Sequence, residues 1–224
     1  MSLDVIEIET APSPNASVLV LHGLGADGND FVPVAHELDL ARVGAVRFVF
    51  PNAPQRAVTV NGGYVMRAWY DILSDELVRG GKMREDEGGL RESRVQVAAV
   101  IANERTRGVP ASRIVIAGFS QGCAMALMTG LRHEERLAGI LGMSGYLPLV
   151  EATRAERHPA NADLPIFLAH GTSDAVIPIS RAVETRDALI ALGHPLEWHA
   201  YPMAHSVCAN EIADINRWLL EVLA

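Results

Sequence analysis

The sequence predicts an α/β protein with a mostly parallel, doubly wound sheet and helices on both faces. Short runs rich in Val, Ile and Leu alternate along the chain with longer stretches of helical spacing. Several of these runs are apolar at nearly every position, as expected for parallel strands covered on both sides. No repeat, low-complexity tract or linker divides the chain, so we expect a single domain over residues 1–224.

The expected elements follow in chain order. Strands are expected at Ser17–His22, Val46–Phe50, Arg113–Gly118, Leu137–Met143, Pro165–His170 and Leu196–Tyr201. Helices are expected at Asp30–Leu38, Leu90–Arg107, Gln121–Leu131, Ser180–Leu192 and Val207–Leu223. Gly193, followed by Pro195, ends the fourth helix in the usual manner.

One stretch, Arg56–Gly89, breaks the alternation of strands and helices. It combines "VTVNGGYVMRAWYDIL" with the charged, glycine-rich "RGGKMREDEGG". Long irregular insertions in compact domains are usually functional, so we expect this one to border the functional site. For Arg79–Gly89 alone, a solvated surface loop is the simpler interpretation.

Composition excludes several classes of function. The 224 residues carry a formal charge of −8 with a pI near 5.5, which argues against a nucleic-acid partner. No apolar run is long enough for stable membrane insertion, and the N-terminus lacks the profile of a signal peptide. The only cysteines, Cys123 and Cys208, make no disulfide framework, so a cytoplasmic location is expected.

A candidate nucleophile lies in the pentapeptide Gly118-Phe119-Ser120-Gln121-Gly122, between a predicted strand and a predicted helix. A serine on such a sharp turn adopts a strained backbone, and its neighbours two residues away must be small. The start of a helix also favours developing negative charge. We therefore predict that Ser120 is a nucleophile; the alternative is a helix-capping serine in a tight turn.

A serine hydroxyl needs a base, and in this architecture the base follows the acid along the chain. Of the late histidines, His199 lies in a predicted strand and His194 lies beside a helix end. His205 lies in the loop after the last strand, at the sheet edge where Ser120 emerges. We predict His205 as the base, and a surface-loop histidine is the alternative.

The acid that orients the base is expected at Asp174, in the loop three residues beyond the strand end at Gly171. Its carboxylate would hold the imidazole tautomer and stabilise the imidazolium. Asp163 lies at the opposite edge of the sheet, and Asp187 lies within a helix. An Asx turn that closes the loop is the competing interpretation of Asp174.

An oxyanion hole requires two preorganised N–H donors. The residue after the nucleophile, Gln121, should supply one backbone amide, and Leu24 in "HGLGADGND" should supply the other. His22 is expected to form structural hydrogen bonds under this loop. The histidines and cysteines show no ligand spacing, so we expect no metal and no cofactor.

Six segments together resemble the carboxylesterase/phospholipase/acyl-protein thioesterase family of the α/β-hydrolases. They are "LHGLGADGNDF" (21–31), "FPNAPQRAVTVNGGYVMRAWYDI" (50–72), "GFSQGCAMAL" (118–127), "SGYLPL" (144–149), "AHGTSDAVIP" (169–178) and "YPMAHSV" (201–207). The resemblance implies an α/β-hydrolase fold with no large lid domain. It also implies that the matching Ser120, Asp174 and His205 form a catalytic triad.

The resemblance further implies an apolar acyl groove. The matching wall positions are Ile72, Leu73, Tyr146 and Val176, and Trp69 would pack beneath the groove. Some relatives carry tryptophan where this chain has Tyr146, which leaves the acyl preference open.

The turn at Gly118–Gly122, which carries Ser120 between strand and helix, is called the elbow. Cys123 departs from the family pattern, because the residue after Gly122 of the elbow is commonly smaller. One turn into a helix, it is expected to be a buried, unreactive thiol.

These residues favour a serine carboxylesterase that hydrolyses short- to medium-chain esters through an acyl-enzyme. The alternative is an acyl-protein thioesterase or lysophospholipase that acts on longer acyl thioesters or lipids. A non-catalytic ligand-binding homologue is the third hypothesis, and a dienelactone hydrolase would need cysteine in place of Ser120. The expected partner is a small-molecule ester or thioester; a monomer and a weak homodimer both fit the resemblance.

Overall fold

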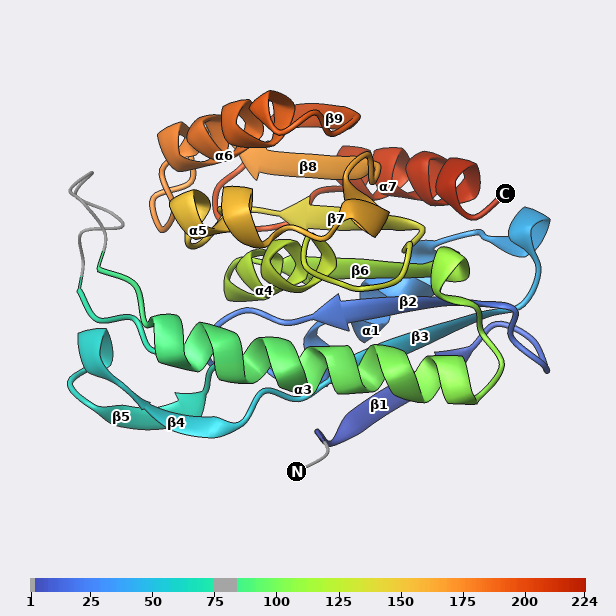
Figure 1. Cartoon of the computed structure of the whole chain (residues 1–224), viewed down its shortest axis with the longest axis horizontal. Coiled ribbons are helices and arrows are strands. Elements are labelled where there is room, and N and C mark those ends of the chain that lie inside the picture. Colours follow the sequence, from blue (N-terminus) through green and yellow to red (C-terminus); the bar gives the residue numbers. More distant parts are fainter. Residues whose placement is uncertain (1–2, 75–83) are drawn as a thin grey trace.

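A computed structural model of the chain describes residues 3–74 and 84–224. Its main sheet has seven strands: β1 Val5–Glu9, β2 Ala16–Leu21, β3 Val46–Pro51, β6 Ile114–Phe119, β7 Gly139–Met143, β8 Ile166–Gly171 and β9 Leu196–Tyr201. Their order is β1-β3-β2-β6-β7-β8-β9 (Figure 1). Every neighbouring pair is parallel except β1 and β3. The predicted mostly parallel sheet is confirmed.

Helices cover both faces of this sheet. The α-helices are α1 Val32–Glu37, α3 Glu87–Thr106, α4 Gln121–Gly130, α5 Val150–Glu156, α6 Ile179–Ala191 and α7 Ala209–Val222. Short 3₁₀ segments occur at Gly28–Phe31, Ala41–Val43, Thr59–Asn61, Ala111–Arg113 and Pro159–Asn161. Helices α3, α4 and α6 build one apolar core, and α1 and α7 build the other on the opposite face (Figure 1). The doubly wound arrangement is therefore confirmed.

Three features of the secondary structure were not anticipated: an edge strand, a hairpin and a short helix. Strand β1 pairs at the sheet edge, where the alternating "VIEIE" needs only one buried face. Within the insertion, β4 Gln55–Val58 and β5 Tyr64–Arg67 form an antiparallel hairpin near the carboxyl ends of the parallel strands (Figure 1). Gly62 and Gly63 both have positive φ in the connection, where glycine is favoured. The third is the short helix α5.

The helix predicted over Asp30–Leu38 is wrong in its first part. The chain makes a 3₁₀ turn over Gly28–Phe31, and α1 begins only at Val32. Pro33 has no N–H to continue a helix from the preceding turn, but it fits the first turn of a new one. The Asp27 side chain starts the 3₁₀ turn by accepting a hydrogen bond from the Asn29 amide at 2.8 Å.

The surface-loop prediction for Arg79–Gly89 is also wrong in part, and its first five residues lie outside the described ranges. Glu87–Gly89 form the first turn of α3, because the Asp86 side chain accepts a hydrogen bond from the Gly89 amide at 3.0 Å. Just before it, Glu85 pairs with Ile72 in an isolated antiparallel bridge. This part of the insertion is therefore anchored to the chain that follows β5.

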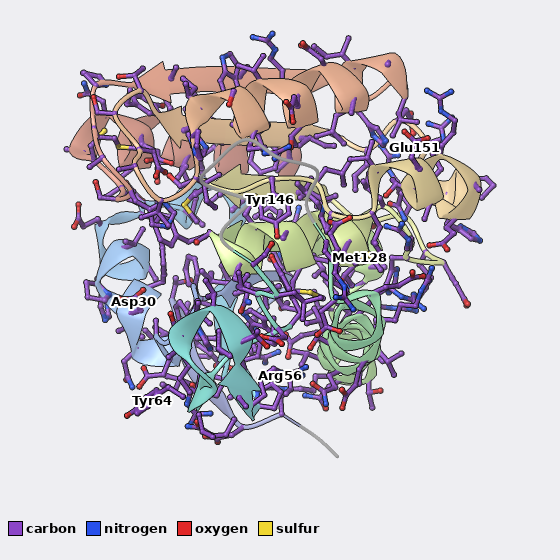
Figure 2. The ribbon with its side chains drawn as sticks, turned by 90° about the vertical axis from the view of Figure 1, so that its left-hand side faces the viewer. Asp30, Arg56, Tyr64, Met128, Tyr146 and Glu151 are labelled. Carbon is purple, nitrogen blue, oxygen red and sulfur yellow. The ribbon has the colours of Figure 1, made fainter. Side chains whose placement is uncertain are left out.

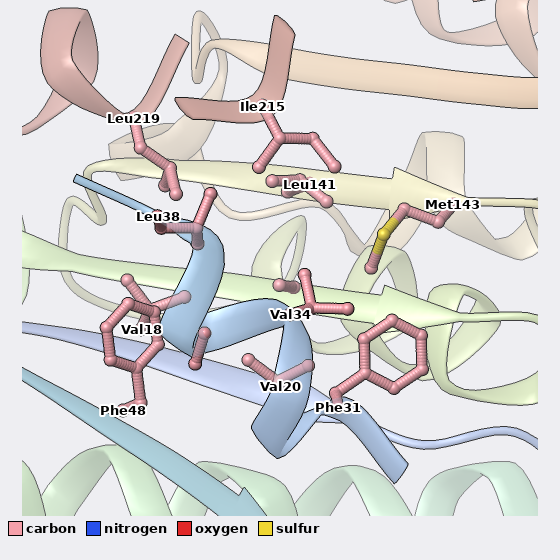
Figure 3. A pocket seen from close by; sticks show the side chains of 12 residues that line it. Val18, Val20, Phe31, Val34, Leu38, Phe48, Leu141, Met143, Ile215 and Leu219 are labelled. Atoms are coloured by element: carbon pink, nitrogen blue, oxygen red, sulfur yellow. The ribbon is translucent and has the colours of Figure 1, made fainter. Parts of the chain in front are cut away.

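A small apolar cavity of about 30 Å³ lies between α1, α7 and the sheet (Figure 3). Its walls are apolar side chains such as Val18, Phe31, Leu141 and Ile215. A void with no polar partner does not hold water stably, so it is a packing defect on the face that carries α1 and α7.

Val18→Ile should stabilise the protein, because the added methylene can enter this cavity. We expect the free energy of unfolding to rise by about 0.8 kcal/mol, measured by urea denaturation. Val49→Ile is the matched control: Val49 lies on neighbouring β3, is equally buried, and packs in the other core. Val49 lines none of the cavities described for residues 3–74 and 84–224, so the same methylene should cost about 1 kcal/mol or more there. Equal effects of the two substitutions would contradict this interpretation.

Candidate active site

Ser120 lies on a strained turn between β6 and α4. Its backbone angles are φ 56° and ψ −117°, in a region that L-residues rarely adopt. A Cβ atom on Gly122 would overlap the Leu21 carbonyl, and one on Gly118 would overlap the Gly122 carbonyl. The turn can therefore form only with glycine on both sides, which agrees with the reasoning from the pentapeptide.

The structure brings the three predicted triad side chains together at the carboxyl edge of the sheet. His205 Nε2 lies 2.9 Å from Ser120 Oγ, and His205 Nδ1 lies 2.7 Å from Asp174 Oδ2. Ser120 and Asp174 are 9% and 8% exposed. If Nδ1 carries the ring proton and donates it to the carboxylate, Nε2 is left free to accept the serine proton.

Asp174 also forms the Asx turn that was the competing interpretation. Its Oδ1 accepts hydrogen bonds from the amides of Val176 at 2.8 Å and Ile177 at 2.9 Å, while Oδ2 faces His205. The two interpretations are thus compatible, since each uses a different carboxylate oxygen. The turn fixes the carboxylate in the orientation that the imidazole requires.

His170, the penultimate residue of β8, was missed by the sequence reasoning. Its Nε2 lies 2.8 Å from the Ile177 carbonyl and 3.4 Å from Asp174 Oδ2. Burial lowers the pKa of His170, so the ring is neutral at neutral pH and donates from Nε2. It supports the loop that carries Asp174. Its place at a strand end, four residues before Asp174, was the signal available in the sequence.

The two predicted oxyanion donors lie beside the nucleophile. Leu24 and Gln121 line the same cavity as Ser120. Within the described ranges, neither backbone amide donates a hydrogen bond to a protein acceptor. Two N–H groups next to the serine are therefore available to a ligand oxygen.

Buried hydrogen bonds hold the loop that carries Leu24. His22 Nδ1 lies 2.7 Å from the Gly23 carbonyl, and His22 Nε2 accepts from the Ala53 amide at 3.0 Å. Burial lowers the pKa of His22, which keeps the ring neutral for this pair of bonds. The Trp69 indole N–H donates to the His22 carbonyl at 2.9 Å. The structural role predicted for His22 is confirmed.

The side chain of Gln121 connects the turn that carries Ser120 to the segment after β5, and no sequence pattern indicates this role. Its Oε1 accepts from the Trp69 amide at 2.8 Å, and its Nε2 donates to the Tyr70 carbonyl at 2.7 Å. Gln121 and Trp69 are both buried. One residue thus supplies a candidate oxyanion amide and fixes part of the cavity wall.

A cavity of about 240 Å³ opens beside Ser120. Its remaining lining residues are mostly apolar: Leu24, Val60, Asn61, Tyr70, Ile72, Ser74, Gln121, Tyr146, Val176 and Ile177. Several belong to the insertion, which confirms that this stretch borders the site. Figure 2 looks onto this edge of the molecule, with Tyr146 near its middle and Tyr64 of the hairpin at its periphery.

Three of the four predicted wall residues, Ile72, Tyr146 and Val176, line this cavity, but Leu73 does not. Leu73 instead borders a much smaller neighbouring pocket. Ile72 lies in an extended bridge with Glu85, and successive side chains of extended chain point to opposite sides. The side chains of Ile72 and Leu73 thus point to opposite sides, and a role for Leu73 in the acyl groove stays a prediction. Trp69 is fully buried, as expected of a residue packed beneath the cavity.

Cys123, in the first turn of α4, is fully buried. Burial raises the pKa of the Cys123 thiol to about 12, so it stays protonated, as predicted. Over the described residues, no group of three or more His, Cys, Asp or Glu side chains is arranged to hold a metal ion. None of the helices in these ranges combines the length and apolar character that crossing a bilayer requires.

A buried carboxyl group lies in the first turn of α7, directly after the His205 loop. Glu211 is fully buried, and neither of its carboxylate oxygens has a side-chain partner among the described residues. Burial raises the pKa of Glu211 to about 8. The group therefore holds its proton at neutral pH.

We expect the stability of Glu211→Gln, measured against that of wild type at the same pH, to increase as pH rises from about 5 to 8. The unfolded glutamate ionises near its ordinary pKa of about 4.3, whereas the folded one keeps its proton until about pH 8. The contribution of Glu211 is thus fully present at low pH and lost as pH rises through this window. The difference in unfolding free energy between variant and wild type should change by a few kcal/mol. A difference that stays constant in urea denaturation at pH 5, 7 and 9 would contradict the assignment.

Comparison with known proteins identifies the family of this chain. A family model described as Phospholipase/Carboxylesterase matches residues 3–223. Acyl-protein thioesterase 1 of Yarrowia lipolytica is 40% identical over 220 residues, which cover 96% of either chain. The crystal structure of Arabidopsis thaliana SOBER1 has a TM-score of 0.87 at 29% identity, covering 93% of this chain and 99% of that one. Acyl-protein thioesterase 2 of Zea mays has a TM-score of 0.85 at 25% identity, covering 99% of both chains. The chain therefore belongs to the phospholipase/carboxylesterase family of hydrolases, with the α/β-hydrolase fold.

Proposed function

We propose that this protein is a serine hydrolase that cleaves acyl thioesters, and more slowly esters, by acyl transfer to Ser120. The observation that carries this proposal is the continuous chain from Ser120 through His205 to Asp174 beside a largely apolar cavity. Activation of a serine by a neutral imidazole held by a carboxylate is suited to attack on an acyl carbonyl.

The proposed reaction gives each residue of the site a defined role, and His205 acts in every step. His205 Nε2 takes the proton as Ser120 Oγ attacks the carbonyl carbon, and the backbone amides of Leu24 and Gln121 bind the oxyanion. Each such donor is worth about 3 kcal/mol of transition-state stabilisation. His205 then protonates the departing thiolate or alkoxide. Water, activated by the same imidazole, hydrolyses the acyl-enzyme and restores the serine.

The thioester preference rests on the relatives. Several are named acyl-protein thioesterases, and the Yarrowia lipolytica protein matches this chain over nearly its whole length. They favour the thioesterase hypothesis over a short- to medium-chain carboxylesterase. A thiolate also leaves more readily than an alkoxide, because its conjugate acid has a pKa of only about 8.5. A cytoplasmic location accompanies the proposal, since Cys123 and Cys208 are both free.

The test is a kinetic comparison of thioesters and oxoesters that carry the same acyl group, over a series of chain lengths. We expect a higher kcat/KM for the thioester of each pair, with the maximum beyond the shortest chains. Intact-mass spectrometry of a quenched reaction should detect one acyl group on wild type and none on Ser120→Ala.

Two outcomes would contradict the proposal in different ways. If kcat/KM is highest for acetyl and butyryl oxoesters, the protein is a short-chain carboxylesterase and not a thioesterase. Absence of turnover and of acylation with every substrate would remove the enzymatic function itself.

A further inference from the structure

Two tyrosines that line the candidate acyl cavity are joined through their hydroxyl groups. Tyr70, from the segment after β5, and Tyr146, from the loop after β7, have hydroxyl oxygens 2.8 Å apart. The two side chains are 3% and 5% exposed. Both line the cavity that Ser120 lines (Figure 2 labels Tyr146). A hydrogen-bonding pair thus lies in a chamber whose other walls are mainly aliphatic.

The hydrogen bond within this pair uses only one of its two hydroxyl protons. Each neutral tyrosine has one O–H hydrogen to donate. Within residues 3–74 and 84–224, neither hydroxyl has a further hydrogen-bond partner. Burial raises the pKa of both Tyr70 and Tyr146, so both stay protonated at neutral pH. One O–H donor is therefore left without an acceptor among the described residues.

A carboxylate that shares a pocket with the pair has its own hydrogen-bond donor. Glu85 borders the small neighbouring pocket together with both tyrosines. Its two oxygens accept hydrogen bonds from the Leu149 amide, at 2.9 and 3.1 Å. The spare tyrosine hydrogen is thus not directed to that carboxylate by any hydrogen bond of the described chain.

We propose that the Tyr70–Tyr146 pair makes this pocket select acyl chains that carry an oxygen acceptor, such as an ether, oxo or hydroxyl oxygen, over plain aliphatic chains of equal length. A buried donor without a partner is unfavourable, and a ligand atom that accepts its hydrogen removes that penalty. A site built to hydrogen-bond a substrate group discriminates against analogues that lack it. The inference rests on the proposed acyl-transfer function, because it concerns the acyl group that Ser120 would receive.

The experiment compares p-nitrophenyl octanoate with isosteres in which one ether oxygen replaces a methylene, from the fourth chain position outward. These positions are too far from the carbonyl to change its reactivity much. Wild type and the double variant Tyr70→Phe/Tyr146→Phe are assayed with the whole series. For each ether substrate we take the ratio of its kcat/KM to that of octanoate. At one oxygen position we expect this ratio to be about tenfold higher in wild type than in the double variant.

The double variant controls for the polarity of the ether, because it keeps the shape of the pocket and lacks both hydroxyls. Equal ratios for wild type and double variant at every oxygen position would overturn the proposal. Failure of wild type to hydrolyse even octanoate would instead count against the proposed function, so the two failures are distinguishable.

Stability gives a second readout that does not depend on turnover. Each single variant leaves one buried hydroxyl with no partner, whereas the double variant leaves none. We therefore expect the urea midpoint of Tyr70→Phe and of Tyr146→Phe to lie below that of the double variant. A double variant less stable than both single variants would show that the two hydroxyls do not act as an isolated pair.

Discussion

Asp174→Asn should lower kcat about 10⁴-fold while the fold is retained. The asparagine carbonyl oxygen can still accept hydrogen bonds from the amides of Val176 and Ile177, so the turn should survive. The amide NH₂ would then face His205 Nδ1 in place of the carboxylate oxygen, now 2.7 Å away. Nδ1 must become an acceptor, which moves the ring proton to Nε2. In that tautomer the imidazole cannot take the proton of Ser120.

The measurement is kcat on one thioester for wild type, Asp174→Asn and Ser120→Ala. Ser120→Ala lacks the nucleophile and gives the lowest expected activity, with kcat reduced on the order of 10⁶-fold. Urea midpoints of the three proteins should agree closely, which separates a wrong tautomer from unfolding. If Asp174→Asn keeps a tenth or more of the wild-type kcat, Asp174 does not orient the base.

The parts of the fold that could be predicted are those whose signal is local. Strands such as β6 and β8 are apolar along nearly their whole length, because both faces are covered by helices. The elbow was recognisable because its geometry excludes side chains at Gly118 and Gly122. Chain order then selected Asp174 and His205, since loops at one edge of a parallel sheet converge.

The parts that could not be predicted depend on partners distant in sequence. The side-chain amide of Gln121 binds the backbone of Trp69 and Tyr70, 52 and 51 residues away along the chain. Nothing in the pentapeptide indicates these partners. The resemblance names Ile72 and Leu73 as wall positions but does not give the direction in which either side chain points. The spare hydrogen of the Tyr70–Tyr146 pair depends on a contact across 76 residues. Such pairings arise only when the chain folds.

Gly122→Ala should destabilise the protein by about 4 kcal/mol or more. A Cβ atom there would overlap the Leu21 carbonyl oxygen and lie 2.5 Å from its carbon and 2.7 Å from the His22 carbonyl oxygen. These are backbone atoms of β2 and of the residue that follows it, and they cannot rotate away. The helix α4 would have to move off the sheet, which would shift Ser120 and the Gln121 amide together. Urea denaturation measures the loss, and kcat on a thioester should fall with it.

Gly88→Ala provides the matched control for this substitution. Gly88 lies in the first turn of α3, where the nearest atom to a new Cβ is Asp86 Oδ1 at 3.7 Å. Alanine is favoured over glycine in a helix by up to about 1 kcal/mol, so this variant should be as stable as wild type or slightly more so. The same added methyl group would thus destabilise the protein at position 122 and leave its stability nearly unchanged at position 88. If Gly122→Ala were as stable and active as Gly88→Ala, the elbow would not require glycine, and the close approach of α4 to β2 would not be what positions Ser120.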